Sequence, residues 1–394
     1  MTDQAETELT ADAMLALAQQ RTGLTDIDSD SWREGLQVVL DDIARPEVPS
    51  SGRDLVVGRC VTALATRLQV HAYVQEHPEV RDETLERPLF ILGMPRTGTT
   101  VASYLLDQHP NRRSLLKWEA AHPVPPPTPE TRRTDPRCLA MKQSDAFILD
   151  YMKSSGGGLA HWEEADGPTE CMFIHDQDFK GLLWDSFTPT TRYADWLLDE
   201  ADLTSTYEYQ KLFLQVLQST SPGRWSLKMP SHSVHLATLL NIFPDAQLVW
   251  SHRDPFQASG SLCNLLKLPA TMVLGADGLD KAALGQNVKR QMREHVVRPL
   301  KVREEIGDDR FFHLHYTDLL RDPMRQMKAL YEWLDEPLTP NVQQRMEAWL
   351  ADNPQHKHGA SSYTLSEYGL TKSELEPTFN EYLSTFDIEL EASA

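Results

Sequence analysis

The segment 89–106 constrains the fold of this chain more than any other part of its sequence. Four apolar residues at its start indicate a buried strand that ends at Gly93, and apolar residues at helical spacing follow from Val101. Between them lies the loop Met-Pro-Arg-Thr-Gly-Thr-Thr. A glycine-bearing loop that joins a strand to a helix offers unpaired backbone N–H groups and a positive dipole end. Arg96 adds a fork-shaped cation, so the segment predicts a site for phosphate or sulfate.

The loop departs from the phosphate-binding pattern G-x-x-x-x-G-K-[ST] in one respect, because Thr99 stands where that pattern has Lys. A nucleoside triphosphatase also needs a strand that ends in an Mg²⁺-binding Asp. The apolar run 246–251 leads instead into His252 and Arg253, and this basic pair favours a second anion site although Asp254 follows it. A donor that needs no Mg²⁺ therefore fits better than ATP. A P-loop small-molecule kinase and a non-catalytic nucleotide-binding scaffold remain as alternatives.

Short apolar runs alternate with helical patterns over most of the chain. The runs that predict strands are 89–92, 225–229, 246–251 and 310–316. Such alternation favours a parallel sheet with helices on both faces. We therefore predict a P-loop-like α/β fold in three layers, α/β/α, with a central parallel sheet of about four or five strands and helical extensions at both ends. The predicted divisions are a helical N-terminal extension over 1–85, the α/β domain over 86–370 and a C-terminal tail over 371–394.

The formal net charge of −20 limits the partners that the chain can take. An acidic protein repels nucleic acid and anionic membranes at long range, so neither is a predicted partner. The first residues, MTDQAETELTADAML, lack the basic and apolar segments of a secretory signal, and no apolar run approaches the ~20 residues of a membrane span. The four cysteines form no Cys-x-x-Cys pair, which argues against a zinc site. Together these features predict a cytoplasmic protein.

Two motifs resemble those of the sulfotransferases that use 3′-phosphoadenosine 5′-phosphosulfate (PAPS). The first is the loop 95–100, and the second is the pair Arg253 and Ser261, eight positions apart on a predicted strand end and the next helix. The resemblance is closest to bacterial members and, in motif layout, to the tyrosylprotein sulfotransferases, and it covers residues 88–370. It implies transfer of a sulfuryl group from PAPS to an acceptor hydroxyl, with adenosine 3′,5′-bisphosphate as the product and no metal ion.

The resemblance also implies how the donor is held. The residues that would hold the 5′-phosphosulfate are Arg96, Thr97, Gly98, Thr99 and Thr100. Arg253 and Ser261 would hold the 3′-phosphate, and Tyr316 would lie near the adenine, with packing of its ring in the core as the alternative. The segment Lys357, His358 and Gly359 is similar to a basic segment that closes over the 3′-phosphate, with a solvent-exposed loop as the alternative.

Three further side chains are candidates for the chemistry. Lys228, at the end of a predicted strand, matches a family lysine that contacts the oxygen bridging phosphate and sulfate, where a fixed ammonium stabilises the developing charge. Glu119 resembles the catalytic glutamate of the tyrosylprotein and related bacterial enzymes, and would take the acceptor's proton. His161 is the alternative base, because cytosolic sulfotransferases use a histidine. Glu163 and Glu164 are expected at a pocket rim or in solvent.

The acceptor is the part of the reaction that the sequence defines least. Six aromatic residues are candidates for an apolar acceptor cavity or for the core: Trp162, Phe173, Phe179, Trp184, Phe187 and Trp196. An acidic chain favours a small-molecule or lipid-like hydroxyl acceptor over a polyanion. The helices of 1–85 are expected to serve packing and oligomer contacts, with a homodimer as one alternative.

Overall fold

The computed structural model describes residues 8–154, 162–189, 191–354 and 363–391. Its centre is a five-stranded sheet in the order β2–β3–β1–β4–β5, and each strand runs parallel to its neighbours. The strands are β1 (Leu89–Gly93), β2 (Arg112–Arg113), β3 (Arg224–Lys228), β4 (Gln247–His252) and β5 (Phe311–His315). The central strand, β1, pairs Leu89 with Ser226 of β3 and with Gln247 of β4. The predicted α/β fold with a parallel central sheet is confirmed.

Helices make up most of the remaining described chain. Before and between the first strands lie α1 (Ala11–Thr22), α2 (Trp32–Ile43), α3 (Ser50–Glu76), α4 (Thr99–Leu106), α5 (Lys117–Ala121), α6 (Pro136–Ser154), α7 (Met172–His175), α8 (Leu182–Asp185), α9 (Thr191–Asp199) and α10 (Thr204–Gln218). After β3 come α11 (Leu236–Ile242), α12 (Pro255–Leu274), α13 (Lys281–Ile306), α14 (Tyr316–Arg321), α15 (Pro323–Trp333), α16 (Pro340–Asp352) and α17 (Lys372–Thr385). In the described parts of the chain, no helix is both long and apolar enough to cross a membrane.

Alternate residues of β1 face two separate apolar cores, which gives the fold its three layers. Leu89 and Ile91 lie in a smaller core with residues of α4, α14, α15 and α16. Phe90 and Leu92 lie in a larger core with residues of α10, α11, α12, α13 and α17. A strand buried on both faces is apolar throughout, which explains why the run 89–92 shows no alternation with polar residues.

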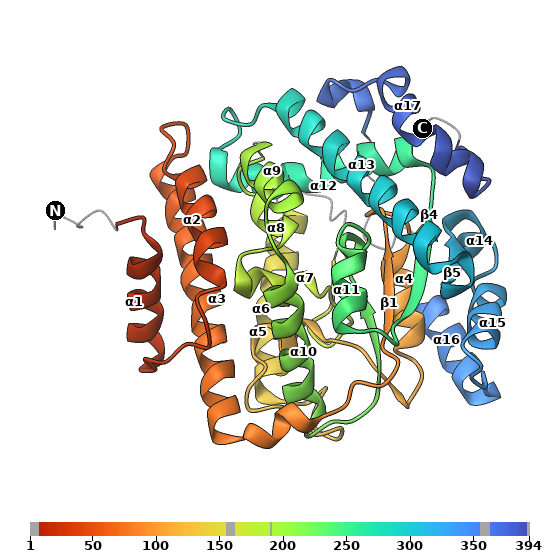
Figure 1. The fold of residues 1–394 in the computed structure, drawn as a ribbon, viewed down its shortest axis with the longest axis horizontal. Helices are drawn as coiled ribbons and strands as arrows, with labels where there is room; N and C mark the ends of the chain where they lie inside the picture. The colour runs from red at the N-terminus through yellow and green to blue at the C-terminus, as the bar shows by residue number, and fades with distance from the viewer. Residues whose placement is uncertain (1–7, 155–161, 190, 355–362, 392–394) are drawn as a thin grey trace.

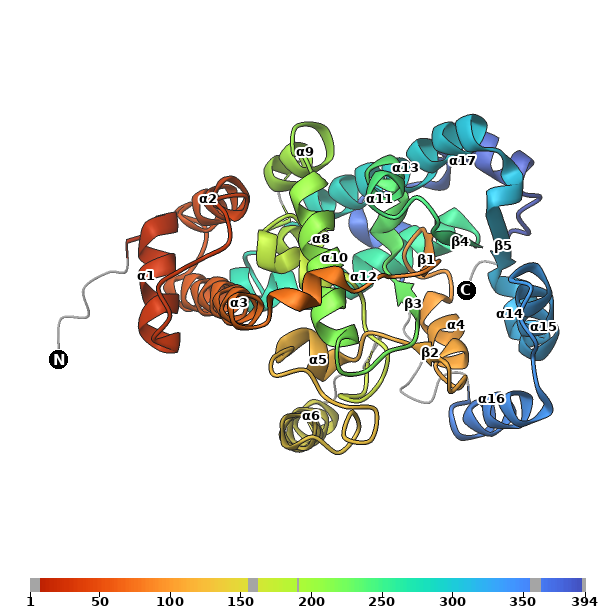
Figure 2. The same ribbon diagram turned by 60° about the horizontal axis from the view of Figure 1, so that its bottom comes forward.

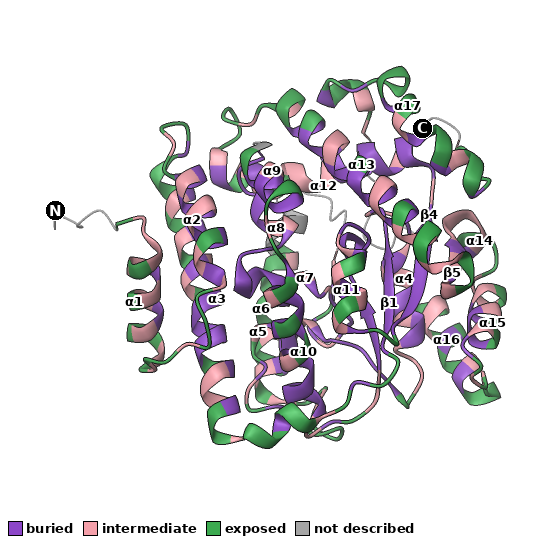
Figure 3. Cartoon of the chain, viewed as in Figure 1, coloured by how far each residue is buried: buried purple, intermediate pink, exposed green. Residues whose placement is uncertain are grey.

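The helical layers extend the molecule on either side of the sheet. Figures 1 and 2 both show α1, α2 and α3 grouped at one end and α14, α15 and α16 at the other. Figure 3 shows that β1 and β4 are buried, whereas the outer helices carry exposed residues on one side. The first helices share the larger core with the sheet through side chains such as Met14, Trp32 and Leu64.

Helix α3 packs tightly on α12, which matters because α12 forms one wall of the cavity described below. A Cβ atom added to Gly52 would lie 2.0 Å from the carbonyl oxygen of Val273, so only a glycine permits this approach. On the same helix, Arg67 is buried and lies 2.7 Å from the carboxylate of Asp178. A buried pair of this kind fixes α3 against the segment that follows α7.

Candidate active site

Four segments that follow the carboxyl ends of parallel strands bring the candidate residues to one edge of the sheet. The loop with Arg96 follows β1, Lys228 ends β3, Arg253 follows β4 and Tyr316 follows β5. Because all four strands run in the same direction, their carboxyl ends meet at this edge, where open α/β sheets bind ligands.

The loop after β1 is shaped by its backbone and by a buried hydroxyl. Gly98 caps α4 with φ 85°, and a Cβ atom there would lie 2.9 Å from the ring of Tyr316, so this position requires glycine. Thr97 is buried, and its Oγ1 lies 2.7 Å from the carbonyl oxygen of Met94 and 2.5 Å from Oγ of Ser251. The side chain of Thr97 therefore holds the loop on β4, and an anion could reach only its backbone.

Arg96 and Arg253 lie together beside this loop. Nε of Arg96 donates to Oγ of Ser261 at 3.0 Å, and Nη1 of Arg253 donates to the backbone oxygen of Arg96 at 2.8 Å. The guanidinium of Arg253 also lies over the ring of Tyr316, 4.1 Å from its centroid. Burial, followed by the charge of Arg253, lowers the pKa of Arg96. Two neighbouring, half-buried cations attract an anion, and the structure thus brings together the residues predicted for both anion motifs.

Lys228 lies between two carboxylates. Its Nζ is 2.7 Å from Oε1 of Glu163 and 3.2 Å from Oε1 of Glu170. Burial alone would lower the pKa of Lys228, but the two carboxylates outweigh burial and raise it, so the ammonium stays charged. Oε2 of Glu163 accepts a bond from the hydroxyl of Thr169 at 2.5 Å, whereas the side chain of Glu170 is 18% exposed and lines the cavity.

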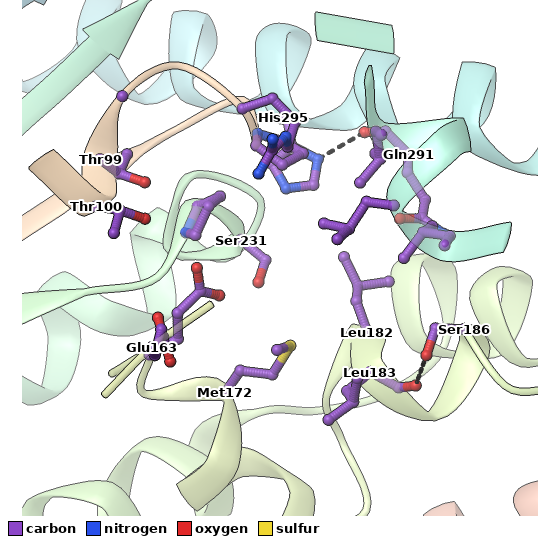
Figure 4. A pocket seen from close by; sticks show the side chains of 18 of the residues that line it. Thr99, Thr100, Glu163, Met172, Leu182, Leu183, Ser186, Ser231, Gln291 and His295 are labelled. Atoms are coloured by element: carbon purple, nitrogen blue, oxygen red, sulfur yellow. Dashed lines mark hydrogen bonds between the residues drawn. The ribbon is translucent and has the colours of Figure 1, made fainter. Parts of the chain in front are cut away.

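The two arginines and the two carboxylates that flank Lys228 open into one cavity of about 470 Å³, whereas Lys228 itself is not among its lining residues. Its polar wall contains Arg96, Gly98, Thr99, Thr100, Arg253, Tyr316 and the two glutamates. Its apolar wall contains Met172, Phe173, Leu182, Leu183, Leu262, Leu265, Leu266, Leu268 and Pro269. Figure 4 shows Thr99, Thr100 and Glu163 on one side of the cavity, with Leu182, Leu183 and Gln291 on the opposite side. The site therefore joins an anion-binding end to an apolar end.

The position of Glu119 does not agree with its sequence-based assignment as the base. Glu119 is buried in α5 and does not line the cavity. Its carboxylate accepts bonds from Arg113 at 3.1 Å, from Arg132 at 3.0 Å and from the backbone N–H of Leu116 at 3.1 Å. Burial would raise the pKa of Glu119, but the two arginines outweigh it and lower the pKa. A fully paired carboxylate without exposed surface is suited to holding α5 in place.

The other candidate residues have mixed outcomes. Glu163, expected at a rim or in solvent, is buried, whereas Glu164 is exposed. Of the six aromatic candidates, Phe173 is among the described residues that line the cavity, and the apolar wall is built mainly from leucines of α8 and α12. His161, Lys357, His358 and Gly359 lie outside the described residues. Among the residues that the structure does describe, no three His, Cys, Asp or Glu side chains are grouped to hold a metal ion.

Sequence reasoning did not identify Glu170. This residue lies in the described segment 162–171 ahead of α7, which contains neither a helix nor a strand. Its only local signal is a carboxylate next to a short apolar stretch that begins at Cys171. Its place beside Lys228 depends on the bond from the backbone N–H of Cys171 to the carbonyl oxygen of Lys228, at 3.0 Å, which only the tertiary structure reveals.

Comparison with known proteins identifies the class. Residues 88–340 match the model of the sulfotransferase family, and this match covers more than half of the chain. The protein belongs to the sulfotransferase family and is a transferase.

Its relatives include mycobacterial sulfotransferases. The chain is similar to the crystal structure of sulfotransferase STF9 from Mycobacterium avium, with 58% identity, a TM-score of 0.94 and coverage of 99% of this chain and 100% of that one. Sulfotransferase STF1 from Mycobacterium tuberculosis is 27% identical, with a TM-score of 0.82 over 95% of this chain and 99% of that one. Omega-hydroxy-beta-dihydromenaquinone-9 sulfotransferase Stf3 from Mycobacterium bovis is 27% identical over 303 residues, 71% of each chain.

Proposed function

We propose that this sulfotransferase moves the sulfuryl group of PAPS to the hydroxyl of a lipophilic acceptor. The observation that carries the proposal is one cavity in which two half-buried arginines and the start of α4 face one end while leucines form the other. An anionic donor and an apolar acceptor can meet there, because both ends open into the same space.

The anion-binding end suits the donor. Arg96, with the backbone N–H groups of residues 97–100 and the side chains of Thr99 and Thr100, would hold the 5′-phosphosulfate at the start of α4. Arg253 and Ser261 would hold the 3′-phosphate, and Tyr316 would lie near the adenine. Lys357, His358 and Gly359, which lie beyond the described residues, stay predicted contacts of the 3′-phosphate.

The reaction would be an in-line displacement at sulfur. The acceptor oxygen forms a bond to sulfur, the bond from sulfur to the bridging phosphate oxygen breaks, and the electron pair leaves on the phosphate of adenosine 3′,5′-bisphosphate. A carboxylate takes the hydroxyl proton, and the charged ammonium of Lys228 stabilises the leaving oxygen. No step of this scheme depends on a metal ion.

Glu170 is the base that the geometry supports best. Its carboxylate lines the cavity and lies 3.2 Å from Nζ of Lys228. It is also near enough to Arg96 for its negative charge to act against the lowering of the pKa of Arg96. Glu163 also lines the cavity but is more deeply buried and is tied to the hydroxyl of Thr169. His161 stays a predicted alternative base.

The apolar wall supports a lipophilic acceptor. Leucines and prolines offer no hydrogen bond to a sugar or a polyanion, so they favour a hydrocarbon body. The name of Stf3, a relative of this chain, specifies a hydroxylated menaquinone as acceptor. A cytoplasmic location, the absence of a nucleic-acid partner and a homodimer stay predictions.

Calorimetric titration tests the donor. We expect adenosine 3′,5′-bisphosphate to bind without metal and more tightly than ADP with Mg²⁺, and we expect Arg253→Ala to weaken binding by about tenfold or more. Arg224→Ala is the control, because this arginine starts β3 at the opposite sheet edge and pairs with Glu336. Preferential binding of ADP with Mg²⁺ would support the kinase instead, and bisphosphate binding without transfer from PAPS to any alcohol would support the scaffold.

A further inference from the structure

Two side chains of α13 present to the apolar part of the cavity acceptor atoms that no described residue pairs. Gln291 and His295 lie four residues apart, line the cavity and are only 3% and 2% exposed. Figure 4 shows both on the cavity wall, with Thr99 and Thr100 to the left of His295 and with Ser186, of the segment after α8, below Gln291 on the right. We call His295, Gln291 and Ser186 the α13 subsite.

The orientation of the His295 ring is fixed by its own helix. Nδ1 lies 2.8 Å from the backbone oxygen of Gln291, and a carbonyl oxygen can only accept, so Nδ1 carries the hydrogen. Burial lowers the pKa of His295 to about 4, which keeps the ring neutral near pH 7. Nε2 therefore carries a lone pair, and among the described residues it has no hydrogen-bond partner.

The side chain of Gln291 is oriented by a buried carboxylate. Its Nε2 donates to Oδ2 of Asp185 at 2.7 Å, and Asn287 donates to the same oxygen at 2.5 Å. Because a carboxylate accepts this bond, the amide nitrogen must face Asp185 and Oε1 must face away from it. Oε1 has no partner within the described parts of the chain. The hydroxyl of Ser186 donates to the backbone oxygen of Leu183 at 2.5 Å. Because its hydrogen is used in this bond, Oγ of Ser186 can only accept a further one.

The α13 subsite thus consists of acceptors only, set among leucines. The cations among the described lining residues are Arg96 and Arg253, which belong to the anion-binding end. An anion would meet lone pairs in this subsite, and a purely apolar group would leave buried acceptors unpaired, at a cost in binding free energy. A neutral hydrogen-bond donor suits these atoms, and on a lipophilic molecule a hydroxyl supplies one such hydrogen.

We infer that the acceptor substrate carries a second hydroxyl, apart from the one that receives the sulfuryl group, and that this second hydroxyl donates its one hydrogen to Nε2 of His295, shared with Oε1 of Gln291 one helical turn away. The inference rests on the proposed function and narrows its substrate class from lipophilic alcohols to lipophilic molecules with two separated hydroxyl groups. His295 and Gln291 would be specificity-determining residues that bind the substrate away from the reacting atoms.

The test compares α,ω-alkanediols with 1-alkanols of the same length, about eight to twelve carbons, by calorimetry on the full chain saturated with adenosine 3′,5′-bisphosphate. A diol has two equivalent ends, which alone favours its binding by a factor of about two. After this factor is divided out, we expect the diol of the best-fitting length to bind at least about fivefold more tightly than the 1-alkanol of the same length. In His295→Phe the preference should fall to about that statistical factor, and in Gln291→Met it should also shrink.

His175→Phe is the matched control. His175 is also buried, bonds to a glutamine (Gln210, 2.6 Å) and has a pKa lowered to about 4 by burial, but it does not line the cavity. This variant should keep the diol preference of the wild type. Three results would overturn the inference: equal binding of diols and alkanols by the wild type, no binding of any alcohol, or a diol preference that survives in His295→Phe. Transfer from PAPS is measured separately, so intact diol preference without any transfer would count against the proposed function alone.

Discussion

Glu391 holds Arg253 through both carboxylate oxygens, with Oε1 2.6 Å from Nε and Oε2 2.9 Å from Nη2. The backbone N–H of Glu391 also donates to Oδ2 of Asp254 at 2.9 Å, and Asp254 caps α12. Burial alone would lower the pKa of Arg253, but the bonds to Glu391 outweigh it and raise the pKa. The end of the described chain thus places a carboxylate on the arginine that we propose for the 3′-phosphate, where a donor would have to displace it.

Removing this carboxylate charge should favour the donor. We expect Glu391→Gln to raise the affinity for adenosine 3′,5′-bisphosphate by about three- to tenfold, because an amide competes less well than a carboxylate for the guanidinium. Titration calorimetry at constant salt measures the change. Glu389→Gln, on an exposed carboxylate two residues earlier, should leave the affinity as it is. Weaker binding by Glu391→Gln would mean that Glu391 orients Arg253 for the donor instead of competing with it.

Glu170→Gln should lower turnover strongly. The amide cannot accept the acceptor's proton, and positioned general bases contribute about 10²–10⁴-fold. Affinity for adenosine 3′,5′-bisphosphate should stay close to that of the wild type, because Lys228 keeps Glu163 as a partner. Single-turnover transfer from PAPS, with Glu164→Gln as the exposed neighbouring control, separates the two effects. Full turnover in Glu170→Gln would return His161 and Glu163 as candidates for the base.

Glu119→Gln should reduce stability instead of catalysis. The substitution leaves Arg113 and Arg132 without their shared buried carboxylate, and breaking a buried pair costs about 3–5 kcal/mol. Denaturant unfolding measures this loss, with Glu130→Gln as an exposed control on the same connection. The folded fraction of Glu119→Gln should retain its turnover. A variant that unfolds like the wild type and transfers no sulfuryl group would restore Glu119 as the base.

The fold was predictable because its main signals are local. Strand β1 is buried on both faces and is therefore a continuous apolar run, and the runs predicted over 225–229, 246–251 and 310–316 are observed as β3, β4 and β5 with bounds that differ by one residue. Strand β2 escaped prediction, since two residues, Arg112 and Arg113, carry no periodicity, and each side chain is buried through bonds to distant partners.

The site was predictable only in part. Arg96, Lys228 and Arg253 could be selected because each lies at the end of a strand or just after one, and parallel strands end at one edge. Glu170 lies in an irregular segment that tertiary contacts place beside Lys228, so no pattern marks it. The assignment of Glu119 meets a related difficulty, because a sequence cannot distinguish a base in a cavity from a carboxylate that two arginines neutralise. In the sequence, Arg132 is 13 positions away from Glu119.

The destabilisation caused by His175→Phe should depend on pH. Nε2 of His175 lies 2.6 Å from Oε1 of Gln210, and burial lowers the pKa of this histidine to about 4, against about 6.5 in an unfolded chain. Between these two values the unfolded chain binds a proton that the folded protein does not, so His175 makes wild-type stability fall as pH decreases from 6.5 towards 4. The phenylalanine variant lacks this term. The difference in unfolding free energy between the two proteins should therefore be largest near pH 7 and shrink by up to about 1.4 kcal/mol per pH unit below 6.5.

Denaturant unfolding of both proteins at stepped pH values measures the difference, with His71→Phe on the half-buried surface of α3 as the control. A difference that stays constant from pH 7 to pH 4 would show that His175 is protonated equally in the folded and unfolded states.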